Sequence, residues 1–288
     1  QQPMDDDVSH LEHKNWQRPP LSPIDPMKDK IVFQQFDCDY TVGEAFQNMP
    51  GPVQLQGPIP IIRMWGVTEA GNSVQCNIYG VLPYFYIPAP NNFQPNDCEP
   101  FRKKLNSRLE SSGRDTAVAG DSVLQVEIVK KESILGYSFE EKKDFLKIVL
   151  RLPKQVPTCR TILESGFTLE GYGDRSFVTF ESNIPFALRF MIDKDIMGAS
   201  WIEIPANTYI TTPKNRKSST CQLEIDVGYD KLISHAPEGE WSKLAPFRIL
   251  SFDIECSGRK GVFPEPEQDP VIQIANLVTV QGESKPII

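Results

Sequence analysis

The sequence predicts an α+β protein, and three patterns carry that prediction. A strand at 61–67, a Gly-containing turn and a returning strand at 73–79 form the pattern of a β-hairpin. From residue 79 to residue 180 the predicted elements follow in the order β-α-β-β-α-β. Two apolar strands, at 247–256 and 269–278, flank a polar loop. Strands and helices mixed in this order place the chain in the α+β class.

The composition is that of an ordinary globular protein. Of 288 residues, 40% are hydrophobic and 24% are charged, which predicts one or two domains. The net charge of −8 excludes a basic surface over the whole chain but allows a local cationic track. No apolar run approaches the about 18 residues of a membrane span. None of the six cysteines has zinc-finger spacing, so we expect free thiols rather than metal ligands or disulfides.

The chain divides into three predicted parts. Residues 1–58 are polar and Pro-rich, which predicts an extended arm. An α+β domain is expected at 59–240, ending at the Pro- and Gly-containing segment 237–240. Residues 241–288 begin another domain, and a core of only about 40–60 residues is marginal. We therefore expect this last domain to be truncated and the chain to be a portion of a longer protein.

The first helix of the α+β domain is expected to begin at Asn96 or Asp97, with Pro100 in its first turn. Apolar residues recur at i, i+4 and i+8 from Phe101 and define its buried face. Its cations could touch phosphates, although a solvated face is the more usual role of such residues. They are Arg102, Lys103, Lys104 and Arg108.

Further elements complete a split βαβ unit, the arrangement that RNA-recognition domains also use. Strands are expected at 123–130, 145–152 and 177–180, and a helix at 158–164. In the first strand of this unit, Tyr84, Phe85 and Tyr86 could stack on bases, but core packing is expected for at least one of them. The fold alone does not predict nucleic-acid binding, because it hosts many functions.

A basic loop follows an expected helix at 186–198 and a strand at 201–205. The segment 214–219 is flexible and cationic, and a strand at 221–227 comes after it. Lys214, Arg216 and Lys217 are therefore the local candidates for contact with a nucleic-acid backbone. The alternative is a loop that is merely solvated.

The strand at 247–256 carries the candidate catalytic residues, Asp253 and Glu255. Residues i and i+2 of a strand point to the same face, so these two carboxylates lie side by side with α-carbons about 6.6 Å apart. At an effective dielectric near 20, two bare charges at that distance repel by roughly 2.5 kcal/mol. Divalent cations about 3.5–4 Å apart, as in phosphodiester-cleaving sites, would relieve that repulsion.

The Asp-x-Glu pattern is weak by itself, because similar pairs occur elsewhere in the chain. Asp97 and Glu99 flank the expected start of a helix, where acids serve as caps and dipole partners. Glu224 and Asp226 lie in another strand and are expected to face water. The tripeptide must therefore be judged by its context.

That context resembles a known family. A strand reading Ser-Phe-Asp-Ile-Glu-Cys at 251–256, a loop, and Asp-Pro-Val-Ile-Gln-Ile-Ala at 269–275 resemble the first exonuclease motif of family B DNA polymerases. The loop and the segment 190–205 resemble eukaryotic replicative members in particular. The resemblance implies that residues 241–288 are the first strands of a ribonuclease-H-like 3′–5′ exonuclease domain. It also implies that Asp253 bridges two Mg²⁺ ions and that Glu255 holds the one that activates water.

The resemblance implies further properties of the whole protein. These are DNA-directed DNA polymerisation, proofreading, primer–template DNA and deoxynucleoside triphosphates as substrates, a sliding clamp and accessory subunits as partners, and a nuclear location. Zn²⁺ and a 4Fe-4S cluster would be bound outside this chain. Three alternatives remain: a non-catalytic nucleic-acid-binding α+β module, a polymerase relative with an inactive exonuclease, and a stand-alone exonuclease of the same acidic type.

Overall fold

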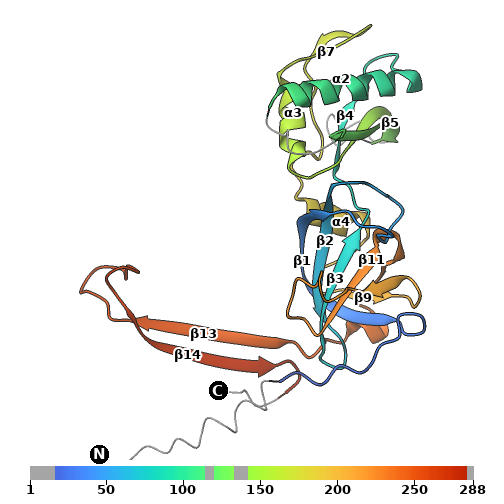
Figure 1. The fold of residues 1–288 in the computed structure, drawn as a ribbon. Helices are drawn as coiled ribbons and strands as arrows, with labels where there is room; N and C mark the ends of the chain where they lie inside the picture. Colours follow the sequence, from blue (N-terminus) through green and yellow to red (C-terminus); the bar gives the residue numbers. More distant parts are fainter. Residues whose placement is uncertain (1–16, 114–119, 133–141, 284–288) are drawn as a thin grey trace, which may run out of the picture.

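The computed structural model describes residues 17–113, 120–132 and 142–283 (Figure 1). Its largest part is a seven-stranded sheet in the order β10-β11-β3-β2-β1-β9-β12. Neighbouring strands are antiparallel except β11 and β3, which run parallel. The strands are β1 (Ile31–Glu44), β2 (Pro58–Val67), β3 (Ser73–Tyr79), β9 (Trp201–Ile204), β10 (Tyr209–Thr211), β11 (Leu223–Gly228) and β12 (Ile233–His235).

One face of this sheet forms the main hydrophobic core. Alternate residues of the central strands point into it and are fully buried, among them Phe33, Ile62, Ile78 and Ile225. Helix α4 (Phe186–Asp193) packs on the same core through Phe186 and Phe190. The expected hairpin (β2–β3), the expected strands β9 and β11 and the expected helix α4 are all present, although α4 ends before residue 198.

The prediction of an extended arm at residues 1–58 is wrong for residues 31–44. They form β1, which pairs with β2 on one side and β9 on the other. The prediction overlooked the gap between Pro26 and Pro50, a stretch without proline that can donate every N–H to a sheet. Residues 1–16 of the predicted arm lie outside the described residues.

Gly66 lets β1 and β2 approach closely, and its replacement gives a prediction. A Cβ at Gly66 would lie 2.3 Å from Cδ2 of Phe33 and 2.5 Å from the backbone oxygen of Gln34. We expect Gly66→Ala to lower the free energy of unfolding by about 3 kcal/mol, because the two strands must separate. Urea unfolding followed by tryptophan fluorescence measures this loss. Gly198→Ala is the control, since no atom lies within 4 Å of a Cβ there.

A smaller unit with its own core lies beyond one end of the large sheet (Figure 1). Its three-stranded sheet has the order β4-β6-β5, and Phe180 adds a single bridge to Tyr86 of β4 in place of the expected last strand. Of the aromatic trio, Phe85 and Tyr86 are buried. The elements are β4 (Tyr84–Pro88), η1 (Pro95–Asp97), α2 (Cys98–Ser111), β5 (Val123–Lys131), β6 (Lys143–Leu150), α3 (Gln155–Ser165), β7 (Phe167–Leu169) and β8 (Gly173–Arg175).

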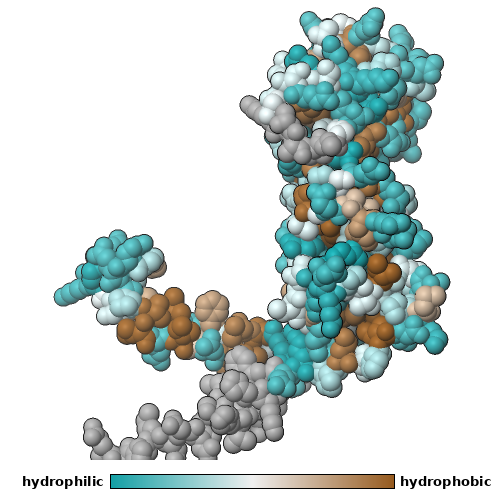
Figure 2. Space-filling model, viewed as in Figure 1, coloured by the Kyte–Doolittle hydropathy of each residue, from teal (hydrophilic) through white to brown (hydrophobic). Residues whose placement is uncertain are grey.

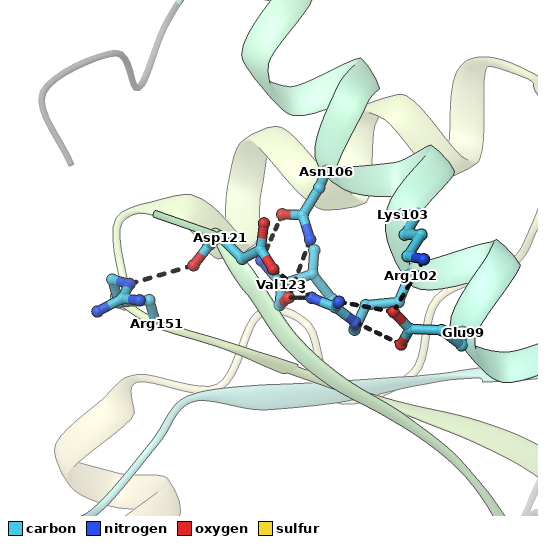
Figure 3. A network of polar contacts seen from close by, with 7 residues as sticks. All are labelled: Glu99, Arg102, Lys103, Asn106, Asp121, Val123 and Arg151. Carbon is cyan, nitrogen blue, oxygen red and sulfur yellow. Dashed lines mark hydrogen bonds and ion pairs between the residues drawn. The ribbon is translucent and has the colours of Figure 1, made fainter. Parts of the chain in front are cut away.

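Polar contacts anchor α2 to the start of β5 (Figure 3). Arg102 donates to both carboxylate oxygens of Glu99, to Asp121 and to the backbone oxygen of Val123. Asn106 exchanges two hydrogen bonds with the backbone of Val123, at 3.0 and 2.8 Å. Arg102, a candidate phosphate contact by sequence, is thus engaged within the fold. Glu99 has the structural role expected of it at the start of the helix.

The last described segment is a long hairpin that projects away from the large sheet (Figure 1). It consists of β13 (Arg248–Cys256) and β14 (Val271–Val280), and two short helices, η2 (Tyr229–Lys231) and η3 (Gly239–Ser242), precede it. All six cysteines are free thiols. None of the described helices is long and apolar enough to cross a bilayer.

Candidate metal centre on the β13–β14 hairpin

Asp253 and Glu255 lie near the distal end of β13, on one face of the hairpin. Each is paired with a residue of β14, Asp253 with Ala275 and Glu255 with Gln273, and side chains of paired residues share a face. Asp253 accepts a hydrogen bond of 3.0 Å from the backbone N–H of Ile254. The residue paired with Asp253 is the small Ala275. The strand therefore presents both carboxylates together, as its alternation predicted.

Among the residues that the structure describes, no cation neutralises these two carboxylates. Both side chains are exposed, and neither forms an ion pair with any other described residue. Two acids on one strand face without a Lys or Arg partner favour an external cation. Hard carboxylate oxygens suit Mg²⁺, which takes oxygen ligands and keeps several waters. The residues thus fit a divalent cation.

The pair is part of a ligand set and not a complete one. Within the described ranges no three His, Cys, Asp or Glu residues come close enough to hold a metal ion. Two carboxylates supply few of the ligands that an octahedral ion needs, and water and substrate oxygens commonly complete such a site. Further protein ligands would have to come from outside the described residues.

Exposed apolar side chains lie on both faces of the hairpin around this pair, as the strand register places them, and Figure 2 shows hydrophobic residues gathered along the hairpin in one view. Phe252 and Ile272 are each 68% exposed, and Ile274 is 59% exposed. Other exposed residues of the same kind are Ile249, Leu250, Ile254, Val271 and Leu277. A strand pair that is apolar on both faces is typical of the interior of a sheet covered on both sides. The carboxylates would then sit in a largely apolar site.

The basic loop is only partly available for contact with a ligand. Arg216 forms an ion pair of 3.0 Å with the buried Asp226, and its guanidinium lies 3.6 Å from the ring centroid of Phe46. Lys217 donates to the backbone oxygen of Cys221. Lys214 is exposed and forms no ion pair with another described residue. The structure therefore leaves Lys214 and the exposed Lys217 as the loop's accessible cations.

The expectation that Glu224 and Asp226 face water is wrong. They are 2% and 0% exposed and lie on the polar face of the large sheet, opposite its hydrophobic core. Glu224 accepts hydrogen bonds from the backbone N–H groups and the hydroxyls of Ser218 and Ser219. The amides of Gln75 and Asn77, on the adjacent strand β3, also donate to it, at 3.3 and 3.2 Å.

Burial by itself raises the pKa of Glu224, but the hydrogen bonds from Ser218, Ser219 and Asn77 outweigh it and leave the pKa below its ordinary value. Glu224 is thus a structural anion that organises the basic loop. The sequence contained a pattern that could have indicated this role of Glu224. Two serines that precede a strand can donate their backbone N–H groups and hydroxyls to an acid at its start.

Comparisons with known proteins agree with this geometry. A family model described as "DNA polymerase family B, exonuclease domain" matches residues 177–288, which include the carboxylate pair. A second, described as "DNA polymerase delta catalytic subunit-like, N-terminal domain", matches residues 80–157. DNA polymerase delta catalytic subunits of Glycine max and Drosophila melanogaster are 51% and 45% identical over 95% and 96% of this chain.

The chain belongs to family B of the DNA polymerases. It spans about a quarter of the length of the curated relatives it matches, 25% in both cases. A solved family B DNA polymerase from Pyrobaculum calidifontis shares its fold, with a TM-score of 0.56, 23% identity, and coverage of 87% of this chain and 26% of that one. The match to the family B exonuclease domain begins at residue 177. It therefore covers strands β9 to β12 of the large sheet as well as the β13–β14 hairpin.

Proposed function

We propose that this chain is the N-terminal portion of a replicative DNA-directed DNA polymerase with a proofreading 3′–5′ exonuclease, and that hydrolysis takes place at Asp253 and Glu255. The observation that carries the proposal is the carboxylate pair on one face of β13, which pairs with no cation in the described part of the chain and lies inside the region that matches the family B exonuclease domain. Identity of 45–51% to delta catalytic subunits supports the replicative assignment.

In this proposal Asp253 and Glu255 hold Mg²⁺. The ions would lower the pKa of the attacking water and stabilise the leaving oxygen of the scissile phosphodiester. The protein's own part is to fix two carboxylates on one face of a paired strand, with the small Ala275 opposite Asp253. The apolar hairpin would exclude bulk water, which strengthens the electrostatic interactions of the site. A mispaired primer end would reach the site more readily than a paired one because it costs less to unpair.

The exposed hairpin also supports the domain division. We propose that residues 241–288 are the opening strands of a ribonuclease-H-like domain whose other parts cover both faces of β13 and β14. The preceding α+β region would then be the N-terminal domain, and it includes β1 (Ile31–Glu44) together with residues 59–240. Its small unit keeps the strand order of a split βαβ fold, with Phe180 bridging the free edge of β4.

The remaining properties belong to the whole protein and are proposed for it. They are primer–template DNA and deoxynucleoside triphosphates as substrates, a sliding clamp and accessory subunits as partners, and a nuclear location. Zn²⁺ and a 4Fe-4S cluster would bind outside this chain. The direct test of the proposed function is removal of both carboxylates, which must abolish excision of a mispaired primer end while primer extension continues.

A second candidate, nucleic-acid binding by the N-terminal domain without catalysis, is favoured by the exposed cations of the basic loop. We predict that Lys214→Gln with Lys217→Gln weakens binding of the complete protein to single-stranded DNA. Each lost phosphate contact should reduce the slope of log K against log salt by about 0.7. Fluorescence anisotropy over a salt series measures the slope. Lys130→Gln, which removes a cation paired with Asp144, is the control. An unchanged slope in the double variant would show that this loop does not contact DNA.

A further inference from the structure

The loop at residues 257–270, which joins β13 to β14, begins two residues after Glu255. The ladder changes register at this point, because Glu255 pairs with Gln273 whereas Cys256 pairs with Val271. Ile272 of β14 is therefore the extra residue of a β-bulge, next to Gln273, the partner of Glu255. A bulge bends its strand and re-aims neighbouring side chains. Glu255 is thus paired at the edge of this bulge.

Arg259 closes the loop around the bulge. Its Nε and one Nη donate to the two carboxylate oxygens of Asp269, at 3.2 and 3.1 Å. The guanidinium also reaches Glu265 at 2.9 Å and Gln268 at 2.8 Å. These bonds join the outgoing side of the loop, four residues after Glu255, to its returning side just before β14. Such a planar fork binds both oxygens of one carboxylate in parallel and still reaches other acceptors, a geometry that a lysine ammonium does not offer.

We call the paired Arg259 and Asp269 the clamp, and Asp269 is its buried residue. It is 4% exposed in a hairpin whose other polar side chains are mostly open to solvent. It accepts a further hydrogen bond of 2.8 Å from the backbone N–H of Glu265. The hydrogen bonds from Arg259 and from the backbone N–H of Glu265 hold the pKa of Asp269 below its usual range. Asp269 is therefore an anion at neutral pH. The N–H of Ser257 donates to the oxygen of Pro270 and closes the base of the loop at 2.9 Å.

We propose that Arg259 and Asp269 are positioning residues that hold the bulge at Ile272, opposite Cys256, and thereby aim the Glu255 carboxylate at the metal site. This inference rests on the proposed exonuclease function. Neither residue bonds to Asp253 or Glu255, and the charge of Arg259 is matched by Asp269 and Glu265. The clamp therefore acts on backbone geometry and does not compete with cations for the catalytic carboxylates.

The test uses the complete polymerase, single-stranded DNA with a free 3′ end, and a Mg²⁺ titration. Arg259→Gln and Asp269→Asn should each lower the exonuclease kcat by about 10- to 100-fold and raise the Mg²⁺ concentration needed for half-maximal rate. Because both variants break the same link, the double variant should be no slower than the slower single one. Primer extension should stay within twofold of wild type in all three.

Two matched variants in the same loop are the controls. Lys260→Gln removes an exposed neighbouring cation and Glu267→Gln an exposed neighbouring acid, and both should keep the wild-type exonuclease rate. Without metal or DNA, hydrogen exchange over residues 256–270 should be faster in Arg259→Gln and unchanged in Lys260→Gln. This second readout is independent of catalysis.

The proposal is overturned if Arg259→Gln and Asp269→Asn excise DNA within twofold of wild type, or if the control variants lose as much activity. It is also overturned if primer extension falls in parallel with excision, since that would indicate general damage. Survival of excision without Asp253 and Glu255 would instead contradict the proposed function, so the two failures are distinguishable.

Discussion

Replacing Asp253 and Glu255 by alanine in the complete protein is expected to lower 3′–5′ excision of a mispaired primer end by at least about 1,000-fold. That loss corresponds to about 4 kcal/mol of transition-state stabilisation. The physical reason is that β13 supplies both carboxylates from one face, and no described side chain stands ready to replace them as metal ligands. Gel analysis of a 3′-mismatched primer without nucleotides measures excision. Adding deoxynucleoside triphosphates to a matched primer measures polymerisation, which should persist.

The chain offers a matched control for this double substitution. Asp37 and Asp39 are also two residues apart on an exposed stretch of a strand, but Arg63 lies 3.5 Å from Asp39 and supplies a protein cation. Asp37→Ala with Asp39→Ala should leave excision unchanged. Wild-type excision in the Asp253 and Glu255 variant would contradict the catalytic assignment. Equal losses in both double variants would show that the effect is not specific to the candidate site.

Replacing Glu224 by alanine is expected to have the largest effect on stability, a loss of about 3–5 kcal/mol in the free energy of unfolding. The substitution removes the acceptor of the backbone N–H and hydroxyl groups of Ser218 and Ser219, and one hydrogen bond each from Gln75 and Asn77, whose amides keep other acceptors. Each group left unsatisfied costs about 1–3 kcal/mol before the loop relaxes. Urea unfolding of the large sheet measures the loss. Glu238→Ala, at an exposed acid, should change stability by less than about 0.5 kcal/mol.

The same prediction has a pH dependence with a definite sign. The pKa of Glu224 is lower in the folded protein than its ordinary value of about 4.3. Its contribution to stability is therefore fully present above about pH 4.3, and it is lost as the pH falls through the folded pKa. The stability difference between wild type and Glu224→Ala should accordingly be constant near neutral pH and shrink in acid. A difference that grows in acid would contradict the role of Glu224 as a buried acceptor.

Local patterns in the sequence were sufficient to predict β2–β3, α2 and β13–β14. Each depends on alternation, turn residues or caps within a short stretch, so its signal is close in sequence. The place of β1 in the middle of the sheet and the parallel pairing of β11 with β3 were not predictable in this way. They depend on distant partners, as in the contact between Gln75 and Glu224, which are 149 residues apart.

In the candidate site, too, the features with a local sequence pattern were predicted and those that depend on distant residues were not. Strand alternation placed Asp253 and Glu255 on one face, and the structure agrees. Charge counting, however, treated Arg216 as a surface cation and Glu224 as a surface acid, because charged residues are seldom buried. The sheet buries both Glu224 and Asp226, and Asp226 then holds Arg216. The clamp of Arg259 and Asp269 was also missed, since a pair ten residues apart across a loop has no periodic signature.

The central claim, that two carboxylates on one strand face hold divalent cations, can be tested by anomalous scattering from Mn²⁺. Crystals of the complete protein with a single-stranded 3′ end should show Mn²⁺ density about 2.0–2.2 Å from carboxylate oxygens of both Asp253 and Glu255, lost in the alanine variant. Density at other side chains only, with these two carboxylates turned to opposite faces of the hairpin, would contradict the account.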